Sequence, residues 1–160
     1  MEEKRIYNFK SVQDLCFADD FMFGAVMKDE RICKGVIERL LHIKIDHIEY
    51  PELQKSISPF YTQRGVRLDV YVEDGKRVFD IEAQTYRLDD VGSRARYYQA
   101  MIDIDNLMRG MDFSELKESY ILFLCTKDPL GKGLPVYTFE RKCKENPDVQ
   151  LNDRTHPYCF

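Results

Sequence analysis

Three acidic residues and one amide recur at alternate positions of two neighbouring segments: Asp69 in the first, and Asp80, Glu82 and Gln84 in the second. Side chains at alternate positions of a strand lie on the same face, so this spacing would gather the four groups. Carboxylate oxygens are typical ligands of hard divalent cations, and Mg²⁺ usually binds one or two protein carboxylates while keeping several waters. The residue types therefore predict a magnesium site.

The two segments, together residues 67–84, have the pattern of a β-hairpin. Apolar residues alternate with polar ones in both runs: Leu68, Val70 and Val72 in the first, and Phe79, Ile81 and Ala83 in the second. Asp74 and Gly75 between the runs are a strong signal for a two-residue turn. With this turn, Asp69 is expected opposite Asp80, and Glu82 becomes a diagonal neighbour of Asp69 at roughly 7 to 8 Å along the backbone. One divalent cation could bridge Asp69 and Glu82.

Each acidic residue also has an ordinary structural explanation. Asp69 alone is typical of a solvated strand residue, and Arg67 beside Glu82 is typical of a surface salt bridge that contributes little to stability. Asp80 is expected to be a neighbour of the site and not a ligand. The three acids together are harder to explain in this way, because like charges that face each other destabilise a sheet. A bound cation would offset that cost.

Two helical patterns precede the hairpin. Asp19 or Asp20 is expected to cap the first and Asp29 the second, and the two form either one bent helix or two separate helices. Residues 44–53 then predict a short strand. Residues 54–65 predict a loop that is long enough for a lid or a substrate contact.

The longest helical pattern, residues 88–111, follows the hairpin. Arg94 and Arg96 lie in its first turns and Arg87 just before it, so a cationic patch is expected beside the acids. Residues 119–126 form a continuous apolar run that is typical of a buried central strand.

The C-terminal part of the chain has weaker patterns. Residues 136–139 predict an edge strand, and the polar, proline-containing residues 143–160 predict little regular structure. The order of elements predicts a single α/β domain over residues 1–160.

Composition fits a soluble globular protein, with 44% hydrophobic and 32% charged residues among 160. The net charge of -4 argues against indiscriminate nucleic-acid binding, so only a local basic patch could contact phosphates. Five cysteines without a CxxC pair fit reduced thiols better than disulfides, although Cys143, His156 and Cys159 could in principle share a metal. The sequence contains no apolar run typical of a signal peptide or a membrane span, and a cytoplasmic location is expected.

Four blocks of sequence together resemble a known family. They are DFMF at residues 20–23, RLDV at 67–70, IEAQ at 81–84 and RARYYQ at 94–99. In this order they resemble the PD-(D/E)XK nuclease superfamily, and more narrowly its branch of recombination-promoting nucleases and transposases. The resemblance spans about residues 19–126.

The resemblance implies a restriction-endonuclease-like core, in which a mixed central sheet of about four strands is flanked by helices, with a shortened C-terminal part as an alternative. It implies a metal-dependent DNA endonuclease that hydrolyses phosphodiester bonds in recombination or transposition, with Mg²⁺ or Mn²⁺ as the cofactor. DNA is then the expected partner, with no membrane association, and a homodimer is a further expectation.

The resemblance also assigns roles to residues. Asp69 and Glu82 would hold the metal together with the backbone carbonyl of Ala83, and Gln84 would orient the attacking water. The supporting acids would be Asp20, Glu38 and Asp80, and the residues contacting the DNA backbone would be Arg94, Arg96 and Tyr97.

Gln84 departs from the superfamily pattern, which usually has lysine at this position. A glutamine brings no positive charge and cannot act as a general acid or base near neutral pH, so slower chemistry is expected. The alternative function is a catalytically inactive domain that only binds nucleic acid or a protein partner. A third alternative is a hydrolase that uses the acid pair on a substrate other than nucleic acid, which the arginines of the following helix do not favour.

Overall fold

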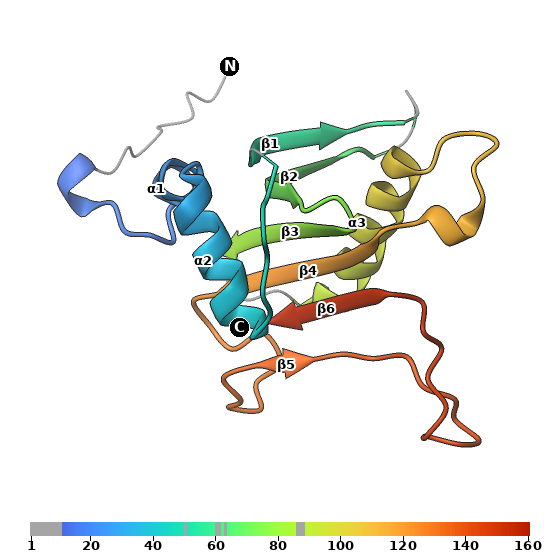
Figure 1. The fold of residues 1–160 in the computed structure, drawn as a ribbon. Coiled ribbons are helices and arrows are strands. Elements are labelled where there is room, and N and C mark those ends of the chain that lie inside the picture. Colours follow the sequence, from blue (N-terminus) through green and yellow to red (C-terminus); the bar gives the residue numbers. More distant parts are fainter. Residues whose placement is uncertain (1–10, 50, 60–61, 63, 86–88) are drawn as a thin grey trace, which may run out of the picture.

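A computed structural model describes residues 11–49, 51–59, 62, 64–85 and 89–160 of the chain. Within these residues a six-stranded mixed sheet has the order β1-β2-β3-β4-β6-β5 (Figure 1). The strands are β1 (Glu52–Ile57), β2 (Val66–Glu73), β3 (Arg77–Gln84), β4 (Glu118–Cys125), β5 (Tyr137–Thr138) and β6 (Thr155–Cys159). The helices are η1 (Val12–Asp14), α1 (Asp20–Met27), α2 (Glu30–Leu41), α3 (Val91–Asn106) and η2 (Phe113–Glu115). The predicted α/β architecture is confirmed, with six strands in place of about four.

The sheet is covered on both faces. Helices α1 and α2 lie against one face and α3 lies against the other (Figure 1). Strand β4 pairs in parallel with β3 on one side and with β6 on the other, and its residues Ser119 to Phe123 are all buried. The prediction of a buried central strand is therefore confirmed, and the two apolar cores meet only through the sheet.

The two helical patterns at the start are two separate helices. The carboxylate of Asp29 caps α2, because it accepts hydrogen bonds from the amides of Arg31 at 2.9 Å and Ile32 at 3.2 Å. Helix α2 ends at Leu41, and the residue that caps it, His42, has a φ of 53°. The carboxylate of Asp19 instead accepts from the amide of Cys16 at 2.8 Å, in the turn that leads into α1.

The first strand does not lie where the sequence predicts it. Residues 44–49 form no strand, although Ile45 and Ile48 are fully buried beneath the helices. The amide of Ile45 is bonded by a side chain, the carboxylate of Glu38 at 2.9 Å, and not by a neighbouring strand. Strand β1 covers residues 52–57 instead, so the first four residues of the predicted loop 54–65 belong to the sheet. Tertiary packing, and not alternation, decides the conformation here.

The hairpin exists, but its predicted register is wrong. Asp74 pairs with Arg77, since its amide donates to the Arg77 carbonyl at 3.1 Å and its carboxylate accepts from the Arg77 amide at 2.8 Å. The turn residues are therefore Gly75, with a φ of 85°, and Lys76. Moving the turn by one residue moves every cross-strand partner by two, so Tyr71 and not Asp69 faces Asp80.

Strand β2 also departs from the strict alternation predicted for it. Val70 and Val72 pack under α1 and α2 as one set, but Leu68 joins Tyr71 in the core under α3. The side-chain pattern changes face at Asp69. Both faces of the hairpin are buried, so β2 is not the half-buried strand that the sequence indicates.

The C-terminal segment contains a strand that the sequence does not predict. Residues 155–159 insert as β6 beside β4, where Tyr158 stacks on Tyr120 with ring centroids 6.4 Å apart. The edge position of β5 is confirmed. The prediction of little regular structure after residue 143 is wrong for β6, because pairing with a central strand overrides the weak local signal of a segment that contains Pro157.

Candidate active site

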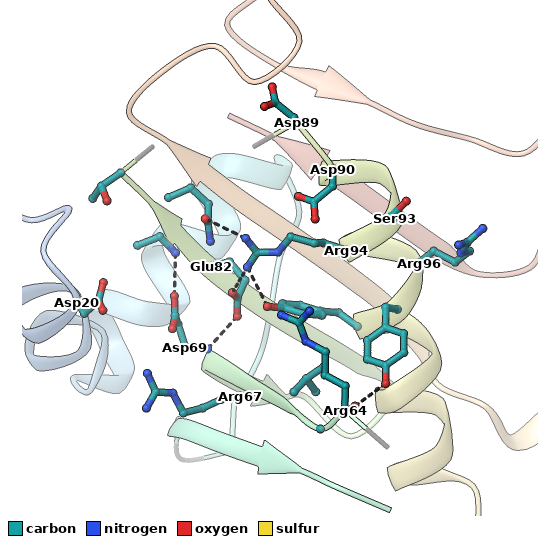
Figure 2. Close-up of a pocket in the computed structure, with 17 residues that line it drawn as sticks. Asp20, Arg64, Arg67, Asp69, Glu82, Asp89, Asp90, Ser93, Arg94 and Arg96 are labelled. Carbon is teal, nitrogen blue, oxygen red and sulfur yellow. Dashed lines mark hydrogen bonds and ion pairs between the residues drawn. The ribbon is translucent and has the colours of Figure 1, made fainter. Parts of the chain in front are cut away.

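Backbone pairing between β2 and β3 ends at Val70 and Ile81, and two carboxylates take over beyond this point. The amide of Asp69 donates a hydrogen bond to Oε1 of Glu82 at 2.9 Å. The amide of Ala83 donates in turn to Oδ2 of Asp69 at 3.2 Å (Figure 2). Each carboxylate therefore accepts a hydrogen bond from a backbone amide of the opposite strand, in place of the backbone carbonyl that would accept it in a regular sheet. The two side chains lie directly across from each other.

These two acids line a cavity of about 910 Å³ between the hairpin, α1 and α3 (Figure 2). The cavity brings together residues that are far apart in the sequence: Asp20, Arg64, Gly65, Val66, Arg67, Asp69, Glu82, Ala83, Gln84, Thr85, Asp89, Asp90, Ser93, Arg94, Arg96, Tyr97 and Tyr98. It includes the predicted catalytic residues and the three predicted DNA contacts, together with Asp20.

Burial disfavours the charged forms of both acids. Glu82 is 2% exposed, and burial together with the neighbouring charge of Asp69 raises its pKa to about 7. Burial also raises the pKa of Asp69, against the lowering effect of the hydrogen bond from the Ala83 amide. Two adjacent carboxylates that resist ionisation are stabilised in their charged forms by a cation between them.

Asp80 lies behind this pair and does not line the cavity. Its side chain is fully buried, and its two oxygens are the buried side-chain polar atoms that lack a hydrogen-bond partner among the described residues. Burial, followed by the charge of Glu82, raises its pKa well above the ordinary value. Asp80 and Glu82 lie close enough to affect each other's pKa: Glu82 raises that of Asp80, and Asp80 lowers that of Glu82. It is placed to influence Glu82 and not to meet a substrate.

Arg94 is directed inward, toward the acids. Its Nη1 donates to Oε1 of Gln84 at 3.3 Å, and its Nη2 donates to the Tyr98 hydroxyl at 2.8 Å and lies 3.8 Å from Oε2 of Glu82 (Figure 2). The guanidinium carbon also lies 5.9 Å from the ring centre of Phe123. A cation thus sits between the acids and the apolar core under α3.

The chain matches the family model described as PD-(D/E)XK nuclease family transposase over residues 12–132. The chain belongs to this family. The match contains α1, the hairpin, α3 and β4, and therefore every element that lines the cavity. No curated protein and no solved structure matches the chain significantly. In the described part of the chain, no helix is long and apolar enough to cross a membrane.

The donor set fits the cations that nuclease families use. The described residues contain no group of three or more His, Cys, Asp or Glu side chains placed to hold a metal. Asp69 and Glu82 form a pair of oxygen donors, which suits Mg²⁺ because this ion completes its shell with water. The alternative metal set of Cys143, His156 and Cys159 does not form, since His156 bonds Glu118 at 2.8 Å and Cys159 is buried in the core under α3.

The remaining predicted residues divide into two groups. Arg96 and Tyr97 line the cavity, and the Tyr97 hydroxyl donates to the backbone carbonyl of Arg64. Glu38 does not reach the cavity, because its carboxylate is bonded to the amide of Ile45. Arg87 lies outside the described residues.

Sequence reasoning missed several lining residues: Arg64, Asp89, Asp90 and Ser93. Ser93 lies in the first turn of α3, and Asp89 and Asp90 directly precede that helix, so the helix start next to Gln84 was the signal that could have found them. Arg64 comes close through the turn before β2, which no local pattern indicates.

Proposed function

We propose that this chain is a metal-dependent DNA endonuclease of its family, linked to recombination or transposition. The observation that carries the proposal is the reciprocal hydrogen bonding of Asp69 and Glu82 in the lining of a cavity. Glu82 is buried and Asp69 is half-buried, and holding two such carboxylates together has no structural benefit that two amides would not provide. A bound cation would offset the cost of placing the two carboxylates together.

Asp69 and Glu82 would hold Mg²⁺ or Mn²⁺, and the backbone carbonyl of Ala83 would add a third oxygen. Bound there, such an ion polarises a phosphoryl oxygen and lowers the pKa of a coordinated water. The protein fixes the two acids by backbone hydrogen bonds from the amides of Asp69 and Ala83, so little reorganisation is needed when the ion arrives. Asp20, which lies near Asp69 and whose charge helps to raise the pKa of Asp69, would orient a water (Figure 2).

DNA binding would rest on local charge, since the whole chain has a net charge of -4. Arg64 lines the cavity from the segment before β2, Arg67 from β2 and Arg96 from α3. Guanidinium groups match the geometry of phosphate oxygens, and contacts to phosphates carry no sequence information. The arrangement therefore favours binding of a DNA backbone without a strong preference for sequence.

A cleavage assay tests this proposal. Supercoiled plasmid is incubated with the protein and Mg²⁺, Mn²⁺ or Ca²⁺, and nicked and linear products are measured. We expect cleavage with Mg²⁺ or Mn²⁺ that is lost in Asp69→Asn and in Glu82→Gln, which keep side-chain size. Glu38→Gln is the matched control, because Glu38 is an acid outside the cavity and a glutamine keeps its acceptor for Ile45. Cleavage that survives in both site variants would contradict the assignment.

A second function is a catalytically inactive domain that binds nucleic acid. The observation that favours it is Gln84, which brings no charge where the superfamily pattern usually has lysine. DNA binding by the wild-type chain, without cleavage in any of the three ions, would support this alternative.

A further inference from the structure

The side-chain amide of Gln84 has a defined orientation. An arginine guanidinium contains only donors, so the atom that faces Nη1 of Arg94 at 3.3 Å must be the carbonyl oxygen of Gln84. The amide nitrogen then lies on the other branch of the side chain. A glutamine held in this way offers hydrogen-bond donors to a ligand, and its acceptor is already in use.

The Gln84 nitrogen is open to the cavity. Gln84 lines the cavity although it is only 4% exposed, and among the described residues its nitrogen donates to no other group. In the described part of the chain, the buried side-chain polar atoms that lack a hydrogen-bond partner are the two oxygens of Asp80. The Gln84 nitrogen is not among them, so it is not fully buried. It therefore presents N–H donors beside Glu82.

Arg94 supplies a positive charge at the same place. Its side chain is 21% exposed, and it lies between Glu82 and the aromatic rings of Tyr98 and Phe123. A charge in such surroundings acts more strongly than a charge in water, because the local dielectric constant is lower. The sequence predicts that Arg94 contacts DNA, whereas its guanidinium bonds Gln84 and Tyr98 and lies beside Glu82.

We propose that Gln84 and Arg94 together replace a lysine: one supplies its hydrogen-bond donor and the other its positive charge. Gln84 donates a hydrogen bond to a non-bridging oxygen of the DNA phosphate, and Arg94 provides the charge and holds the amide in this orientation. Arg94 is thus a positioning residue. This inference rests on the proposed nuclease function and names the substrate group that the site recognises, an anionic phosphate oxygen.

The first test removes the donor. Gln84→Met keeps side-chain length but has no N–H, and we expect kcat for plasmid cleavage to fall about 100-fold or more, as for other losses of a donor to a developing oxyanion. KM should change little. Arg96→Gln, two residues from Arg94 on the same helix, is the matched control and should raise KM more than it lowers kcat, because Arg96 has no bond to the acids among the described residues.

The second test is a rescue that a purely structural role for Arg94 would not produce. Arg94→Gln should lower kcat by a similar factor. Adding Gln84→Lys to that variant returns a donor and a charge to one side chain, and kcat should recover at least tenfold over Arg94→Gln alone. Full activity of Gln84→Met would overturn the inference. So would a double variant whose kcat does not recover although it is as stable to unfolding as Arg94→Gln. Neither result would contradict the nuclease proposal.

A measurement without turnover keeps the two proposals separate. A short DNA duplex is added with Ca²⁺ to ¹⁵N-labelled wild-type protein, and the side-chain NH₂ signals are followed by NMR. The Gln84 signal should move on binding. The Gln99 signal should not, because its nitrogen already donates to Asp103 and Ser119. An unmoved Gln84 signal in the saturated complex would overturn the inference even if the wild-type chain cleaves nothing.

Discussion

The amide of Asp69 donates a hydrogen bond at 2.9 Å to Oε1 of Glu82, so the spacing of the two acids is set by the backbone of β2. A site held in this way keeps its geometry when the charge of either acid is removed, because Asn and Gln still present an acceptor oxygen. Effects of such variants on metal binding and cleavage can therefore be separated from effects on folding.

Metal binding is expected to raise the stability of the wild-type chain. A cation that binds the folded state only stabilises it by mass action, about 2.7 kcal/mol at a concentration 100 times the dissociation constant. We expect Mg²⁺ and Mn²⁺ to raise Tm of the wild-type protein, and we expect no rise in Asp69→Asn or Glu82→Gln. Differential scanning calorimetry with and without each ion checks this. An equal rise in Glu82→Gln would place the binding elsewhere.

Without metal, stability should fall as the pH rises from about 4.5 to 7. The folded-state pKa of Glu82, about 7, is raised above its ordinary value by burial and by Asp69. The folded state therefore holds this proton after the unfolded chain has lost it, and the favourable contribution, roughly 3 kcal/mol, disappears as the pH passes through 7. Urea unfolding across this range should show the slope, and Glu82→Gln should reduce it to the part that Asp69 and Asp80 contribute.

The hairpin shows how far the sequence predicts the site. Alternation locates both strands and puts Asp69 and Glu82 on one face, and a register error of two residues preserves that face. The register itself depends on Asp74 binding Arg77 through its side chain as well as its backbone, which makes Gly75 and Lys76 the turn. No local pattern distinguishes this turn from the one predicted, and the correct turn brings the two acids closer than the diagonal arrangement would.

Other features depend on contacts between distant segments. Strand β6 forms because residues 155–159 find β4 as a partner, and their own sequence gives little sign of a strand. The inward direction of Arg94 depends on Gln84 and Tyr98, which the helical pattern of α3 cannot place. The sequence predicts a cationic helix face. It does not predict that Arg94 turns toward the acids while Arg96 lines the cavity without a bond to them among the described residues.

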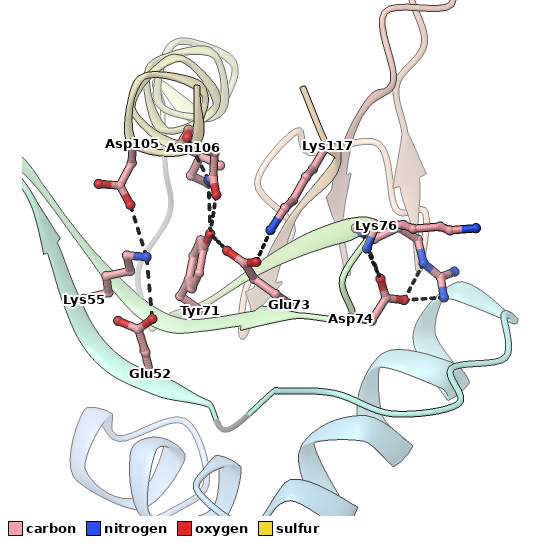
Figure 3. Close-up of polar contacts among 11 residues, drawn as sticks. Glu52, Lys55, Tyr71, Glu73, Asp74, Lys76, Asp105, Asn106 and Lys117 are labelled. Carbon is pink, nitrogen blue, oxygen red and sulfur yellow. Dashed lines mark hydrogen bonds and ion pairs between the residues drawn. The ribbon is translucent and has the colours of Figure 1, made fainter. Parts of the chain in front are cut away.

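A polar network fixes the other end of β2, away from the cavity. The carboxylate of Glu73 accepts hydrogen bonds from the Tyr71 hydroxyl and from Lys117, and Asn106 of α3 donates to the same hydroxyl at 3.1 Å (Figure 3). Lys55 also lies 3.7 Å from the ring centre of Tyr71. The network joins β1, β2, α3 and the segment before β4, and so holds α3 against the hairpin.

Lys117→Met should destabilise the fold and leave the site intact. Burial alone would raise the pKa of Glu73, but the bonds from Lys117 and Tyr71 hold it below its ordinary value. We expect a loss of about 2 kcal/mol in the free energy of unfolding at pH 7, since a partly buried acid loses its partner. The wild-type advantage should shrink as the pH falls below 4.5, where Glu73 becomes protonated in the unfolded and then in the folded chain. Urea unfolding at pH 7 and at pH 3.5 compares the two chains.

Normal metal-induced shifts in Tm are expected in Lys117→Met, because the network lies outside the cavity. A loss of metal response in this variant, with the fold retained, would show that the two ends of β2 are coupled.

Asp80→Asn should stabilise the metal-free protein near neutral pH. Asp80 is fully buried and its oxygens have no hydrogen-bond partner among the described residues, so an uncharged side chain of the same size avoids both the desolvation cost and the repulsion with Glu82. We expect a gain of about 1 kcal/mol at pH 8 and a smaller one at lower pH, because the raised pKa of Asp80 lets the folded state keep this carboxyl neutral there. Urea unfolding of the two chains at pH 8 and at lower pH checks this. A variant less stable than wild type at pH 8 would mean that the Asp80 carboxylate has a favourable partner, and a metal-dependent difference would identify that partner as the bound ion.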